Sequence, residues 1–139
     1  MDCPVVLDTG PLVAMLDRND SWHQWAGDQI RYLTAPMLTC EAVVSESIFL
    51  LRPMDPSCAQ LTGLFRDGIV RLDFALQDNF SAVATLLAKY QEVPMSLADA
   101  CLVRMSELHD RARVFTLDSA FRHYRRHGRQ TIPLLHPAR

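Results

Sequence analysis

The chain has 139 residues, of which 49% are hydrophobic and 22% charged, and its formal net charge is −2 at pH 7. These values exclude a mostly disordered chain, and we expect a single domain over residues 1–139, a length that can bury a substantial core. No apolar stretch approaches the roughly 18 residues of a transmembrane helix, and the N-terminus lacks the features of a signal peptide. We therefore expect a cytoplasmic protein with no membrane contact.

Short apolar segments alternate with helical segments along the chain. The predicted strands are 4–7, 36–38, 69–72, 114–117 and 131–135. The last of them suits a sheet edge because it contains a proline. The predicted helices are 11–17, 21–33, 40–51, 56–67, 78–91 and 97–110, with a further helix from Asp118 to Gly128. This alternation predicts an α/β fold with a mostly parallel central sheet flanked by helices.

Acidic residues follow the predicted strands or open the predicted helices. Asp8 comes directly after strand 4–7, and Asp118 directly after strand 114–117. Asp99 lies in the first turn of a helix, three residues after Ser96, which is the spacing of a capping box. Each aspartate alone also suits an ordinary cap or turn. Ligands of open parallel sheets bind beyond the carboxyl ends of the strands, so the three together indicate a site there.

Glu46 is harder to explain as a surface residue. Helical spacing places it beside Leu50 on one side and Ala42 and Phe49 on the other. An unpaired carboxylate among apolar groups is costly, so we expect Glu46 to face inward. Clustered carboxylates repel one another unless cations neutralise them. Hard oxygen ligands suit Mg²⁺ or Mn²⁺, which can act on phosphodiesters.

Four segments carrying these acids resemble the motifs of the PIN-domain ribonucleases, and among them the VapC-type toxins of bacterial toxin–antitoxin modules. The segments are 6–12 (VLDTGPL), 38–46 (LTCEAVVSE), 95–100 (MSLADA) and 115–121 (FTLDSAF). They occur in the family's order and extend over almost the whole chain. Gly10 departs from the pattern, because the family often has serine at that position.

The resemblance implies a PIN-like fold and a hydrolase, a divalent-metal-dependent endoribonuclease that uses Mg²⁺ or Mn²⁺. The catalytic set that it implies is Asp8, Glu46, Asp99 and Asp118. The three aspartates would bind the metal, and Glu46 would bind metal or orient the attacking water. Thr9 and Thr116 would support the site, Thr116 through its hydroxyl. The resemblance further implies an RNA substrate, a homodimer and inhibition by a small antitoxin protein.

Two other functions share these features. A housekeeping RNA-processing PIN nuclease would use the same chemistry as a toxin. A non-catalytic PIN-like module would bind RNA or a protein, although it would not need the complete set of acids. A haloacid-dehalogenase-like phosphotransferase is excluded, because Gly10 occupies the position of its second aspartate.

Basic residues gather near the C-terminus. Residues 104–139 carry eight arginines and three acids, whereas residues 1–103 carry six basic and thirteen acidic side chains. Spacings of three and four would align a set of arginines on one side of the helix predicted after Asp118, namely Arg122, Arg125, Arg126 and Arg129. They would either compensate the helix dipole or form a phosphate track for RNA.

Overall fold

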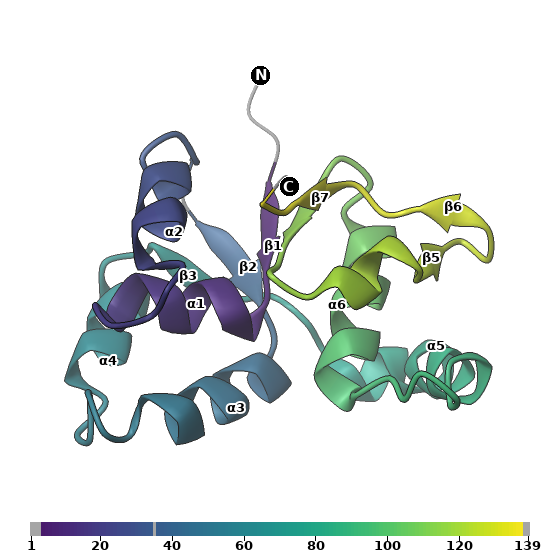
Figure 1. Cartoon of the computed structure of the whole chain (residues 1–139). Helices are drawn as coiled ribbons and strands as arrows, with labels where there is room; N and C mark the ends of the chain where they lie inside the picture. The colour runs from purple at the N-terminus through teal and green to yellow at the C-terminus, as the bar shows by residue number, and fades with distance from the viewer. Residues whose placement is uncertain (1–3, 35, 138–139) are drawn as a thin grey trace.

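The computed structural model describes residues 4–34 and 36–137 (Figure 1). The predicted domain also includes residues 1–3, 35 and 138–139, which lie outside the described residues. A five-stranded sheet has the order β3-β2-β1-β4-β7, and all its neighbouring strands are parallel. The strands are β1 (Val5–Leu7), β2 (Met37–Thr39), β3 (Val70–Leu72), β4 (Arg113–Phe115) and β7 (Leu134–Leu135).

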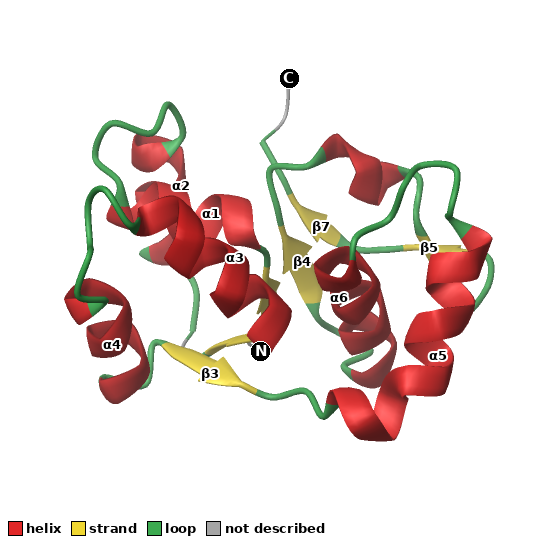
Figure 2. Cartoon of the chain, turned by 90° about the horizontal axis from the view of Figure 1, so that it is seen from below, coloured by secondary structure: helices red, strands yellow, loops and turns green. Residues whose placement is uncertain are grey.

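Two groups of helices cover the sheet. The helices are α1 (Thr9–Leu16), α2 (His23–Ile30), α3 (Glu41–Leu51), α4 (Ala59–Arg66), α5 (Leu76–Lys89) and α6 (Leu97–Leu108). Figures 1 and 2 show α1 to α4 on one side of the sheet and α5 and α6 on the other. Right-handed crossovers in opposite directions across a parallel sheet produce this arrangement. The predicted α/β fold with a parallel sheet and flanking helices is confirmed.

The central strand β1 explains why the first segment of the chain is so apolar. Val5, Val6 and Leu7 are each no more than 1% exposed, since helices cover both faces of the sheet at this strand. α6 packs against β1 and β4, and its Leu102 and Met105 are fully buried. The core therefore holds the end of β1 in place, and the residue that follows it is positioned by buried structure.

Strand order reverses at β1. The chain builds β1, β2 and β3 in one direction and then crosses to place β4 on the other side of β1. Ligands of open α/β sheets bind in the crevice at the carboxyl edge of such a switch point. Asp8 and Thr116 immediately follow the two paired strands β1 and β4 at this edge.

The segment after Asp118 departs from the sequence prediction. Instead of one helix ending at Gly128, the chain forms a short 3₁₀ helix, η1 (Ser119–Arg122), and a strand, β5 (Arg125–Arg126). β5 pairs antiparallel with β6 (Gln130–Thr131), and the turn contains His127 and Gly128 at φ values of 50° and 84°. The strand expected over 131–135 is divided between β6 and the sheet-edge strand β7. We refer to residues 119–131 as the C-terminal arm.

Candidate active site

Asp8 is the most deeply buried acid at the carboxyl edge of the sheet, with 7% of its surface exposed. Its Oδ1 accepts a hydrogen bond of 2.7 Å from the backbone N–H of Thr9. Its Oδ2 accepts one of 2.6 Å from the hydroxyl of Thr116, which lies 108 positions further along the chain. The parallel register that places Leu7 opposite Phe115 brings these two residues together. The hydroxyl of Thr116, for which a supporting role is predicted, therefore contacts Asp8 directly.

Burial changes the protonation of Asp8. Removal from water raises the pKa of its carboxyl from the ordinary 3.8 to about 6, because the charged form loses hydration. The hydrogen bonds from Thr116 and Thr9 oppose this rise, and the negative charges of Asp99 and Asp118 add to it. The metal-free folded protein therefore disfavours the ionised form of Asp8, and a bound cation would stabilise that ionised form.

Asp99 combines a structural and a candidate functional role. It is the third residue of α6 and forms the predicted capping box, in which its backbone N–H donates to the Ser96 hydroxyl at 3.0 Å. Its Oδ2 accepts from the backbone N–H of Ser96 at 3.4 Å and from the hydroxyl of Tyr124 at 2.9 Å. The side chain is half-buried, and this burial raises the pKa of its carboxyl. Sequence reasoning missed the contact with Tyr124.

Glu46 lies at the same site, but it is not buried. Its Oε1 accepts a hydrogen bond of 2.9 Å from the hydroxyl of Thr9, which joins α3 to the start of α1. The expectation that apolar neighbours would draw Glu46 inward is wrong, because Glu46 is exposed and Phe49 and Leu50 are themselves 66% and 44% exposed. Thr9 contacts both acids, Glu46 with its hydroxyl and Asp8 with its backbone N–H. Its supporting role stays a prediction.

Asp118 is the N-cap of η1, and its Oδ1 accepts from the backbone N–H of Ala120 at 2.9 Å. Its own backbone N–H donates to the hydroxyl of Thr116 at 2.9 Å. Thr116 therefore donates to Asp8 and accepts from Asp118, so one fully buried hydroxyl fixes the relative positions of two acids. The side chain of Asp118 is exposed, unlike that of Asp8.

The four predicted acids line a single cleft of about 470 Å³, which we call the acidic cleft. Its lining residues are Asp8, Thr9, Gly10, Glu46, Leu50, Ser96, Asp99, Leu117 and Asp118. The acids come from the ends of β1 and β4 and from α3 and α6, so segments that are distant in sequence converge here. A second hollow, of about 510 Å³, shares Glu46 and Ser96 with the acidic cleft.

The donor set of the acidic cleft suits a hard divalent cation. Its candidate ligands are carboxylate oxygens, and the charges of Asp99 and Asp118 disfavour the ionised form of Asp8. Among residues 4–34 and 36–137, no three His, Cys, Asp or Glu side chains form a preassembled metal cluster. Mg²⁺ commonly takes only one or two carboxylates and completes its shell with water and substrate phosphate. The residues present therefore fit such an ion.

The four arginines do not form the predicted stripe along one helix side. Arg126 is 9% exposed and donates to the backbone carbonyls of Ser106 and Asp110 at 2.9 and 3.0 Å. The guanidinium of Arg125 donates to the carbonyls of Arg122 and Tyr124. Arg129 is exposed near the turn between β5 and β6, and Arg122 is exposed at the end of η1. The predicted helical arrangement is therefore wrong, since the arm is not helical and the guanidinium of Arg126 is bonded to buried backbone carbonyls. Contact of Arg122, Arg125 and Arg129 with RNA stays a prediction.

Open α/β sheets bind ligands at the switch point, and carboxylates that hold divalent ions can act there on phosphate esters. The chain belongs to the PIN-domain family: the sequence profile of the PIN domain matches residues 5–127. PIN domains are generally nucleases that act on RNA with divalent metals, and all four acids of the cleft lie within the matched range. A search of curated proteins finds no match. No helix among the described residues is long and apolar enough to span a membrane.

Proposed function

We propose that this protein is a divalent-metal-dependent endoribonuclease of the cytoplasm and the toxin of a toxin–antitoxin pair. The observation that carries the proposal is the convergence of Asp8, Glu46, Asp99 and Asp118 on one cleft. A cap or turn residue needs no such neighbours. Burial raises the pKa of Asp8, and the negative charges of Asp99 and Asp118 add to this rise, so a bound cation would stabilise its ionised form.

The roles of the residues follow from their contacts. Asp8 and Asp99 would hold Mg²⁺ or Mn²⁺, and Asp118 would complete the site. A bound divalent ion supplies Lewis-acid stabilisation of the phosphate and lowers the pKa of an attacking water. Glu46, fixed through Oε1 by Thr9, keeps a second oxygen to orient that water. Thr116 holds Asp8 in the orientation that the metal requires.

The surface beside the acidic cleft supports a single-stranded nucleic acid as substrate. The adjoining hollow is lined largely by apolar groups, among them Phe74, Leu76 and Leu97. Nucleobases of single strands pack on aromatic and apolar side chains. A phosphodiester in the acidic cleft would place a neighbouring base close to this hollow, because the two share Glu46 and Ser96.

The test of catalysis is cleavage of a fluorescently labelled single-stranded RNA by the purified protein. We expect cleavage with Mg²⁺ or Mn²⁺ and none with a chelator. Asp99→Asn keeps the side-chain shape and should lower the rate by at least roughly 100-fold, since a lost metal ligand removes several kcal/mol of transition-state stabilisation. Glu92→Gln, a change at an exposed acid outside the acidic cleft, is the matched control and should cleave normally. Undiminished cleavage by Asp99→Asn would contradict the proposed site.

The finer parts of the proposal need separate measurements. A toxin should arrest growth when expressed alone and be tolerated together with the small protein encoded beside it. Normal growth in both cases, with metal-dependent cleavage in vitro, would favour a housekeeping RNA-processing nuclease. RNA binding without cleavage would favour a non-catalytic module. Sedimentation of the purified protein tests the expected homodimer.

A further inference from the structure

Tyr124 of the C-terminal arm is a polar residue in an apolar location. It is 1% exposed, and its hydroxyl donates to Asp99 Oδ2 at 2.9 Å. Its ring packs edge-on against Phe121 and Tyr90, with centroids 5.1 and 5.0 Å apart. A buried tyrosine hydroxyl needs a hydrogen-bond partner, and here the partner is a carboxylate of the acidic cleft.

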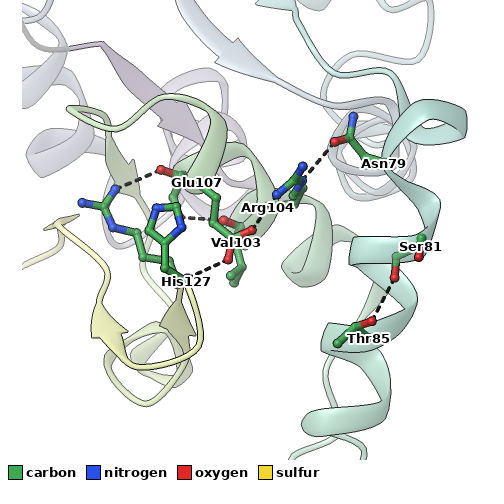
Figure 3. Close-up of polar contacts among 9 residues, drawn as sticks. Asn79, Ser81, Thr85, Val103, Arg104, Glu107 and His127 are labelled. Carbon is green, nitrogen blue, oxygen red and sulfur yellow. Dashed lines mark hydrogen bonds and ion pairs between the residues drawn. The ribbon is translucent and has the colours of Figure 1, made fainter.

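The position of Tyr124 is set by contacts other than its bond to Asp99. The next residue, Arg125, donates its backbone N–H to the hydroxyl of Tyr90 at 2.9 Å. Figure 3 shows Glu107 of α6 between Arg104 and His127; it accepts from the His127 backbone N–H at 2.7 Å and from Arg104 at 3.0 Å. The two residues that follow Tyr124 at positions 125 and 127 thereby fasten the arm to the C-cap of α5 and to α6.

The contact leaves the two oxygens of Asp99 in different situations. Oδ2 accepts from Tyr124 and Ser96, whereas Oδ1 has no hydrogen-bond partner among the described residues. The phenol is the donor in this contact, because an ionised carboxylate can only accept. A carboxylate held through one oxygen by a fixed donor presents the other to a ligand in a defined orientation.

We propose that Tyr124 is a positioning residue that holds Asp99 in the orientation in which it binds the divalent cation. This inference rests on the proposed function, since it assigns Tyr124 a role toward the metal of that site. The alternative is that Tyr124 only fills the core between α5, α6 and the arm. The two roles differ in whether loss of the hydroxyl alone changes cation affinity.

The experiment compares Tyr124→Phe with Tyr90→Phe. Each removes one hydroxyl and keeps a ring of the same aromatic cluster, so both variants should fold, as checked by circular dichroism. Tyr90 bonds the backbone of the arm, whereas Tyr124 bonds the acid. Free Mn²⁺, counted by electron paramagnetic resonance, gives the affinity without any activity assay. Asp99→Asn is the reference for loss of the ligand.

We expect Tyr124→Phe to weaken Mn²⁺ binding about 10–100-fold, which is typical for removal of a residue that orients a metal ligand. The Mn²⁺ concentration for half-maximal RNA cleavage should rise by the same factor, and KM for RNA should stay unchanged. Tyr90→Phe should alter Mn²⁺ affinity less than about twofold, because its hydroxyl does not touch an acid.

Three results would overturn the inference. Wild-type Mn²⁺ affinity in Tyr124→Phe, while Asp99→Asn loses binding, would leave the acidic cleft intact as a metal site and refute only the role of Tyr124. Equal weakening by Tyr90→Phe would show that the aromatic cluster acts through packing. Unchanged Mn²⁺ binding in Asp99→Asn would instead refute the proposed metal site, and the role of Tyr124 with it.

Discussion

Replacing Asp8 with asparagine should stabilise the metal-free protein at neutral pH. Burial raises the pKa of Asp8 from 3.8 to about 6, a rise that corresponds to roughly 3 kcal/mol of unfavourable free energy for the charged, folded form. Asparagine retains an oxygen to accept from the Thr9 backbone and gains N–H groups that can donate to the Thr116 hydroxyl. The variant should therefore recover up to about 3 kcal/mol.

The sign of the pH dependence follows from the direction of the shift. A carboxyl that binds its proton more tightly in the folded state carries no penalty below its unfolded pKa. The penalty develops as the pH rises from about 4 to 6 and is complete above that. The difference in stability between Asp8→Asn and wild type should thus be largest near neutral pH and fade on acidification.

This difference is measured by urea denaturation in the presence of a chelator, monitored by circular dichroism, at pH values from about 4 to about 8. Subtracting the wild-type curve removes the titration of all other groups, and Glu92→Gln controls for loss of an exposed charge. In saturating Mg²⁺ the order should reverse, because only the wild type gains binding energy from the ion. A pH-independent difference in the chelated protein would refute the burial argument.

Two further changes test contacts around the acidic cleft. Thr116→Val removes a buried hydroxyl that bonds both Asp8 and the Asp118 backbone. It should lower the free energy of unfolding by about 1–3 kcal/mol, measured by urea denaturation. It should also raise the pKa of Asp8, measured from the acid limb of the pH profile of RNA cleavage. Arg126→Met should cost roughly 1–3 kcal/mol in the same denaturation assay, because it leaves the carbonyls of Ser106 and Asp110 without their donor. The salt dependence of RNA binding by Arg126→Met should match that of wild type, and a flatter slope would restore Arg126 as a phosphate contact.

The parts of the site that lie at strand ends could be predicted from sequence. The apolar run before Asp8 predicts a buried central strand, and the run over 114–117 predicts β4, which ends at Phe115, two residues earlier than predicted. The capping box of Ser96 and Asp99 is a local signal, and it is confirmed. In each case the signal lies within a few neighbouring residues, because local burial and local backbone hydrogen bonds decide the structure there.

The C-terminal arm could not be predicted in this way. Spacings of three and four among arginines indicate a helix only if local preferences decide the structure. Here Tyr124 and Arg126 are buried by partners on α6, and the alternation of buried Tyr124, half-buried Arg125 and buried Arg126 is that of a strand. Those partners are distant in sequence, so no local pattern specifies them.

For Glu46, the local sequence pattern predicts the wrong environment. Apolar neighbours on a helix usually mark the buried face, but Phe49 and Leu50 lie on an exposed part of α3. The position of Glu46 depends instead on Thr9, 37 positions earlier in the chain. The prediction placed the residue at the site for a reason that the structure does not support.

The hydrogen bond between Thr116 and Asp8 also determines when the acidic cleft can form during protein synthesis. Asp8 is made first, but Thr116 follows 108 residues later, and β4 must pair with β1 before the two side chains meet. At typical rates of protein synthesis that interval is roughly 5–20 seconds. The cleft is completed only after nearly the whole chain has been synthesised.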